Sequence, residues 1–155
     1  MPSWKTILLA GGFLFGGIAF ATASEKTIQR AELPAAVRKT ADEQSKGATI
    51  RRYVKDNEGG KPAYEVEMTV DGHSKDASIA PDGRVLEVEE QVKLESLAGE
   101  VREGLQRKAG KGAITKVESI TKGGKIVAYE AQVKTAGRHS EVQVGPDGKP
   151  LDHEE

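Results

Sequence analysis

This 155-residue chain contains one sequence pattern twice. From Glu32 onward, the pattern recurs 64 residues later, and 65 residues later once a single residue has been inserted. The matches keep their order and include Gly-Gly-Lys at residues 59 and 123, Tyr-Glu at 64 and 129, and Pro-Asp-Gly at 81 and 146. An ordered series of this kind predicts a tandem duplication. Two units are too few for a solenoid, in which at least three repeats stack.

Each unit is expected to begin with a helix. In the second unit, apolar residues recur at the three- and four-residue spacing of one buried helix face: Leu94, Leu97, Val101 and Leu105. Ser96 is the expected N-cap, and Gly110 and Gly112 are the expected end. In the first unit, Pro34 fits the first turn, where its missing N–H costs nothing, and Gly47 ends the helix.

Antiparallel strands are expected after each helix. Residues 64–70 and 129–135 alternate between apolar and polar side chains, which is typical of a strand with one covered face and one solvated face. Shorter alternating segments at 77–79 and 142–144 predict a third strand, and one at 86–88 predicts a fourth.

Two local signals interrupt this alternation. Ile50 and Tyr53, like Ile114 and Val117, are three residues apart, which breaks the period of two and predicts a bulge or an irregular strand entry. The repeated Pro-Asp-Gly is typical of a type I turn followed by a left-handed glycine, so we interpret it as a hairpin turn without a ligand-binding role.

These patterns predict an α+β fold: a tandem duplication of a helix packed on one face of a roughly four-stranded antiparallel sheet. The predicted units are residues 24–92 and 93–155. The expected core of the first unit is Leu33, Val37, Ile50, Tyr64, Val66, Met68, Val70, Ala77, Ile79 and Leu86. That of the second is Leu97, Val101, Ile114, Tyr129, Ala131, Val133, Val142, Val144 and Leu151.

The first 23 residues have the pattern of a signal peptide. Lys5 precedes an uncharged apolar segment, and Ala21 and Ala23 supply the small residues that signal peptidase reads. Cleavage after Ala23 gives a periplasmic or secreted protein. The alternative is an uncleaved anchor, since the uncharged stretch is close to the roughly 18–20 residues that cross a bilayer. Membrane contact is then expected only through this segment.

Composition narrows the functional classes. The chain has no cysteine, so an exported form relies on packing without disulfides. Residues 32–92 carry nine basic and thirteen acidic side chains, whereas residues 96–155 carry ten and nine. A nucleic-acid-binding protein needs a basic patch with stacking aromatic side chains, and no such patch is present.

The sequence predicts neither catalytic residues nor a metal site, and no cofactor. It lacks a nucleophile elbow, a phosphate loop, an HExxH motif and a calcium-loop motif. His73, His139 and His153 are expected in solvated loops; a terminal zinc pair of His139 and His153 is the alternative. We therefore expect a protein that is not an enzyme.

The motifs resemble the PepSY and PepSY-like family. The first unit carries the matching segments at residues 32–40, 47–54, 63–72 and 80–92, and the second keeps most of them, with Ala98 in place of proline. The tandem arrangement is similar to the β-lactamase inhibitor protein fold. The resemblance implies an exported module that binds or restrains an extracytoplasmic protein, with a secreted peptidase as the candidate target. It carries over no catalytic residues.

Two functional hypotheses follow. The first is this non-enzymatic PepSY-type module, a predicted inhibitor. The second is an acidic periplasmic protein that binds a cation or small ligand. The sheet face left open by the helix is the expected partner-binding surface, polar and flat. Its candidate residues in the first unit are Glu65, Glu67, Thr69, Asp76, Glu87 and Glu89.

Overall fold

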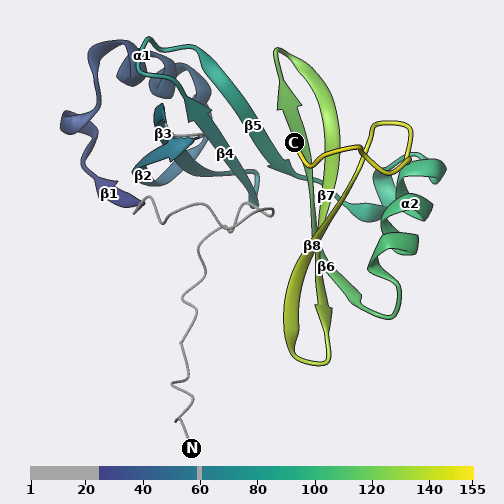
Figure 1. The fold of residues 1–155 in the computed structure, drawn as a ribbon. Helices are drawn as coiled ribbons and strands as arrows, with labels where there is room; N and C mark the ends of the chain where they lie inside the picture. The colour runs from purple at the N-terminus through teal and green to yellow at the C-terminus, as the bar shows by residue number, and fades with distance from the viewer. Residues whose placement is uncertain (1–24, 59–60) are drawn as a thin grey trace, which may run out of the picture.

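The computed structural model describes residues 25–58 and 61–155 (Figure 1). The predicted signal peptide, residues 1–23, lies outside the described residues, as does the pair Gly59-Gly60. No described helix has the length and apolar character needed to cross a membrane.

The described chain forms eight strands, two α-helices and two short 3₁₀ helices. Their order is β1 (Lys26–Ile28), η1 (Arg30–Glu32), α1 (Ala35–Gln44), β2 (Thr49–Glu58), β3 (Lys61–Val70), β4 (His73–Ile79), β5 (Val85–Gln91), η2 (Leu94–Ser96), α2 (Gly99–Ala109), β6 (Ala113–Lys122), β7 (Lys125–Thr135) and β8 (Arg138–Val144). Every strand pairs antiparallel with the next strand along the chain, so the sheet is a simple meander.

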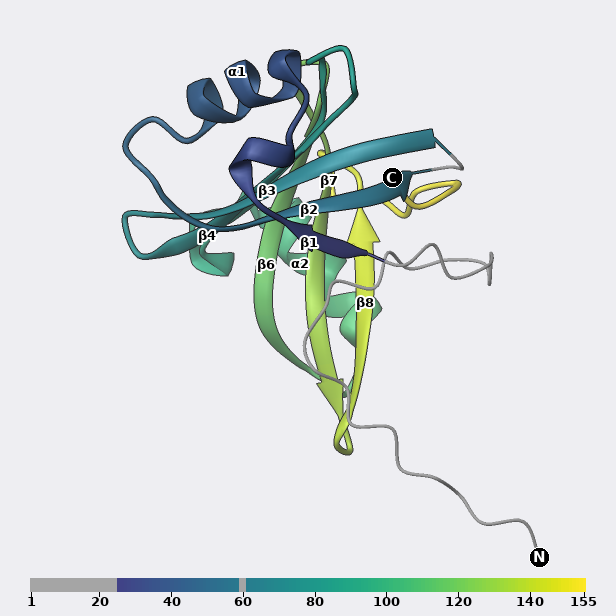
Figure 2. The same ribbon diagram turned by 90° about the vertical axis from the view of Figure 1, so that its left-hand side faces the viewer.

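The prediction of a four-stranded sheet in each unit is wrong. All eight strands belong to one sheet, because β5 pairs with β6 from Val88↔Thr121 to Gln91↔Glu118. An unpaired strand edge has free backbone N–H and C=O groups. Here the edge strand of the first half, β5, pairs with the edge strand of the second half, β6. The sheet twists strongly across this junction, so the strands of the first half run across those of the second in Figure 2.

Both helices cover the same face of the sheet. α1 contacts β4, and α2 contacts β6, β7 and β8. The side chains of the register pairs Ala77↔Val88 and Glu90↔Ser119 lie on the same face of the sheet, so this face continues across the junction. Both apolar clusters lie on this face. The opposite face carries no helix and is described below as the acidic face.

The alternation predicted for β3 is confirmed, because Val66 and Met68 are fully buried beneath α1. The buried residues of the first cluster are Ile28, Leu33, Val37, Ala41, Tyr53, Tyr64, Val66, Met68, Ala77 and Ile79. Those of the second are Val101, Leu105, Val117, Ala131, Val133 and Val144. Most predicted core residues are in these clusters or packed against them; Leu86 and Leu151 are half-buried outside them.

The predicted helix start in the second half is wrong by two residues. Ser96 belongs to η2, and its hydroxyl donates to the carbonyl of Lys93 at 2.7 Å. α2 instead begins after Ala98, which makes no side-chain cap. Its end agrees with expectation, because Gly110 follows the last helical residue with a φ of 58°.

Both Pro-Asp-Gly segments form turns, and each turn packs against a helix. The hairpin prediction is confirmed for the first turn, between β4 and β5, and is wrong for the second, because no strand follows β8 in the described residues. The hydroxyl of Thr40 in α1 donates to the carbonyl of Gly83 at 2.7 Å. In the second half, Gly148 lies so close to α2 that a Cβ on it would overlap the carbonyl oxygen of Glu100. A Cβ on Gly104 would in turn overlap the carbonyl of Gly148. The glycines therefore serve both turn geometry and helix docking.

Replacing Gly148 by alanine tests this docking. Gly148→Ala is expected to lower the free energy of unfolding by about 2–5 kcal/mol, because overpacking costs about 1–3 kcal/mol and a left-handed alanine about 1–2 kcal/mol. Gly137→Ala is the matched control, since Gly137 has a similar φ of 81° but open space around it. Urea denaturation measures both; equal losses would contradict the docking argument.

Candidate functional site

The acidic face collects carboxylates from both halves of the sheet. The registers Glu67↔Asp76, Asp76↔Glu89 and Glu118↔Glu130 place these side chains on the face opposite the helices. The acidic side chains on this face include Glu65, Glu67, Asp76, Glu87, Glu89, Glu118, Glu130 and Glu141. Carboxylates so concentrated repel one another unless protons, basic groups or cations compensate their charge.

Four of these carboxylates are buried, so the expectation of a solvated, flat polar face is wrong. The exposed fractions are 5% for Glu67, 4% for Asp76, 3% for Glu87 and 1% for Glu118. Apolar Val54 and Ile120 share this face and are each 1% exposed. The twist of the sheet and neighbouring side chains thus cover the centre of a face that sequence alternation alone predicts to be exposed to solvent.

Basic side chains compensate part of this buried charge. Arg52 lies 2.5 Å from Glu67, and Arg51 lies 3.0 Å from Asp76. In the second half Lys116 pairs with Glu118 at 2.6 Å. Lys122 approaches Glu87 at 3.1 Å and the side chain of Glu155 at 3.4 Å, which brings the C-terminus beside this face.

The pKa values of several carboxyl groups on this face are raised far above their ordinary range. Burial, with repulsion from Glu87 and Glu118, raises the pKa of Glu89 to about 9. Burial likewise raises the pKa of Glu65 to about 8 and that of Glu130 to about 7. Asp76 has a pKa raised to about 6 by burial, although Arg51 opposes the shift.

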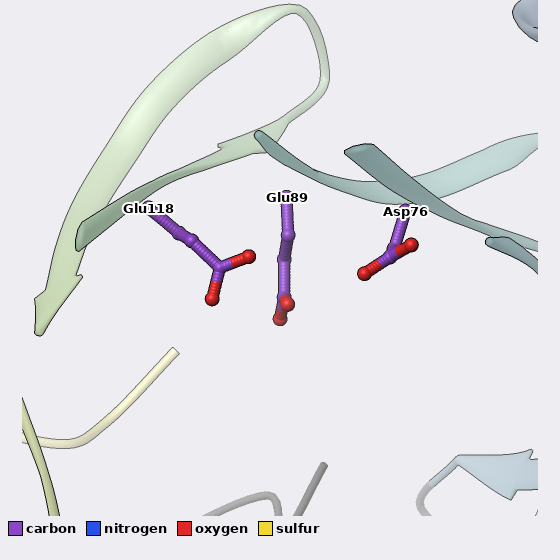
Figure 3. A group of neighbouring side chains, drawn as sticks. All are labelled: Asp76, Glu89 and Glu118. Atoms are coloured by element: carbon purple, nitrogen blue, oxygen red, sulfur yellow. The ribbon is translucent and has the colours of Figure 1, made fainter. Parts of the chain in front are cut away.

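Three carboxylates converge at the junction of the halves. Asp76 of β4, Glu89 of β5 and Glu118 of β6 each offer one oxygen, and these oxygens all lie within 4.8 Å of one another. Figure 3 shows the three side chains projecting to the same side of their strands, with Glu89 between the other two. Among the described residues, these three side chains are close enough together to bind one metal ion between them.

The structure brings the sequence-predicted residues of the first unit together with acidic side chains of the second unit, among them Glu118. Glu65, Glu67, Asp76, Glu87 and Glu89 all lie on the acidic face, and Thr69 is half-buried at the end of β3. Their role in partner binding stays a prediction. Glu118 was missed because its facing depends on the register break between Ile114 and Lys116. That irregularity was itself predicted from the three-residue spacing, and its equivalent in β2 is also present.

The histidines lie apart from this group. His73 has its Nε2 3.0 Å from a carboxylate oxygen of Glu90. His139 in β8 and His153 in the tail are exposed.

Comparison with known proteins defines the fold class. No protein-family model matches the chain. No curated protein matches it in sequence. Solved structures do match, and they give the chain a BLIP-like fold.

Three of these structures come from Bacteroides species. A BLIP-like protein from Bacteroides fragilis has a TM-score of 0.56 at 15% identity, covering 75% of this chain and 81% of that one. A DUF2874 family protein from Bacteroides ovatus has a TM-score of 0.60 at 14% identity, covering 77% and 84%. A protein from Bacteroides eggerthii that has been assigned to the periplasm has a TM-score of 0.63 at 14% identity, covering 76% and 85%.

The raised pKa values predict that stability falls as pH rises. In the unfolded chain, Glu65 and Glu130 lose their protons near pH 4.5, their ordinary pKa. In the folded protein, Glu65 keeps its proton up to about pH 8 and Glu130 up to about pH 7. Their contribution is present below pH 4.5 and lost through this window. Glu65→Gln or Glu130→Gln should make the pH dependence shallower. Urea midpoints between pH 5 and 9 in EDTA measure the slope.

The exposed Glu103 on α2 supplies the control for this series. Glu103→Gln removes one charge at a distance from the acidic face. An unchanged slope in both acidic-face variants, compared with this control, would contradict the assignment.

Proposed function

We propose that this protein is an exported, non-enzymatic module that binds or restrains an extracytoplasmic protein through its acidic face. A secreted peptidase is the candidate target, as the PepSY resemblance implies. The predicted signal peptide supports export. The similarity to a protein assigned to the periplasm supports the same compartment, and the BLIP-like fold supports a binding role.

The observation that carries this proposal is the charge on the helix-free side of the sheet. Carboxylates from both halves share this face, and several remain partly exposed around the buried centre: Glu65, Glu89, Glu130 and Glu141. A basic segment of a partner protein is the complementary surface. Such association is assisted by electrostatics and is weakened by salt.

The test must leave the buried ion pairs intact. Glu67 and Glu87 are buried and paired with Arg52 and Lys122, so replacing them would disrupt ion pairs that compensate buried charge. The triple variant Glu65→Gln, Glu130→Gln and Glu141→Gln changes only half-buried carboxylates. In capture from envelope extract at pH 9, above the raised pKa values of Glu65 and Glu130, we expect at least a tenfold loss of the partners retained by the immobilised protein and identified by mass spectrometry.

The helices offer a matched control of the same size. Glu43, Glu100 and Glu103 are exposed on α1 and α2, away from the acidic face. The corresponding triple glutamine variant should retain the captured partner, and circular dichroism checks the fold of both variants. Retention by the acidic-face variant at low and high salt, or loss with the helix variant instead, would place the binding surface elsewhere.

A second candidate function is the binding of a cation by an acidic periplasmic protein. The observation that favours it is the convergence of Asp76, Glu89 and Glu118 on one point. It can operate with or without a protein partner.

A further inference from the structure

We propose that Asp76, Glu89 and Glu118 form a calcium-binding site at the junction of the two halves. This inference rests on the second candidate function, cation binding, and does not depend on a protein partner. The three residues come from adjacent strands, β4, β5 and β6, and their carboxylates project to the same side (Figure 3).

The spacing of the oxygens fits a large divalent cation. Calcium binds oxygen at about 2.3–2.6 Å, so two ligands on opposite sides of the ion are separated by about 4.8 Å. One oxygen from each of the three carboxylates lies within that limit of the other two. Magnesium demands near-ideal octahedral geometry and is usually held by only one or two carboxylates, so a group of three favours calcium. The all-oxygen ligand set also disfavours zinc, which prefers nitrogen and sulfur.

Two buried oxygens lack another partner. Arg51 donates a hydrogen bond to Oδ1 of Asp76, and the ammonium group of Lys116 pairs with Oε1 of Glu118. Oδ2 of Asp76 and Oε2 of Glu118 are buried and accept no hydrogen bond from any described residue. The two side chains are only 4% and 2% exposed. A buried acceptor without a partner costs about 1–3 kcal/mol, or more when it is charged, and a bound cation removes that cost.

The neighbouring basic groups set the affinity. Arg51 and Lys116 each neutralise part of the charge of a ligand, so they reduce the attraction for a cation. Three carboxylates also supply fewer ligands than the six to eight that calcium takes unless some bind through both oxygens or water completes the shell. We therefore expect a dissociation constant in the range of extracellular calcium modules, about 10⁻⁴–10⁻³ M.

The position of the site gives binding a structural consequence. Asp76 and Glu89 belong to the first half and Glu118 to the second. Only four register pairs of β5 and β6 join the halves within the sheet. A cation held by all three carboxylates adds a further link across that junction, beside the ion pair of Lys122 with Glu87, so it should stabilise the whole sheet against unfolding.

Calorimetric titration of the EDTA-treated, dialysed protein with CaCl₂ at pH 7.5 tests the site. We expect one calcium ion per chain. At ten times the dissociation constant, Tm should rise by about 4–8 °C. Titrations with MgCl₂, and with NaCl at matched ionic strength, serve as controls for selectivity and for screening of the acidic face.

Variants locate the site. Glu89→Gln is the first choice because it is nearly isosteric and Glu89 is only half-buried, so the fold should survive. It should weaken calcium binding at least tenfold, as should Asp76→Asn. Glu65→Gln, on the same face but outside the cluster, should bind calcium normally. The proposal is overturned if calcium gives no heat up to 10 mM, if NaCl reproduces the rise in Tm, or if both cluster variants bind like the unmodified protein.

Discussion

The pairing of β5 with β6 is the contact on which the rest of the molecule depends. It joins two helix-covered halves into one sheet and holds both helices on the same side. It also fixes the registers that bring Asp76, Glu89 and Glu118 together. Without it, each half would carry a free strand edge, and its carboxylates would face water separately. A backbone interaction of a few residues thus creates both the architecture and the electrostatics of the acidic face.

The acidic face balances three ways of compensating crowded carboxylates. Ion pairs with Arg51, Arg52, Lys116 and Lys122 stabilise the most buried acids. Protons compensate others, since burial raises the pKa of Glu89 well above neutrality. The proposed calcium ion would replace the proton at the one point where three carboxylates converge. The same face can therefore hold a cation at its centre and meet a basic partner at its margin.

The sequence predicted the local structure well because its signals are local. Alternation fixed the facing of Val66 and Met68, and the Pro-Asp-Gly turns agree with the left-handed φ values of Gly83 and Gly148. The pairing of β5 with β6 could not be predicted in this way, because alternation states which face a side chain takes but not which strand lies beside it. The same limit explains why Glu118 was missed.

Burial of the acidic face was unpredictable for a related reason. A glutamate on the polar side of an alternating strand is expected in water, and Glu67 and Glu87 follow that pattern in sequence. Their burial depends on the twist of an eight-stranded sheet and on basic side chains from other strands, such as Lys122. The charges of those partners were visible in the sequence, but their positions were not.

The meander has a consequence for how the chain reaches this structure. Each strand pairs with its neighbour in sequence, so most strand pairs are hairpins that close a short loop; β1 with β2 and β5 with β6 are the pairs separated by a helix. Chains rich in local contacts fold faster than sheets built from distant pairings. A chain that enters a compartment N-terminus first can therefore assemble its sheet hairpin by hairpin. Each completed strand then serves as the template for the next.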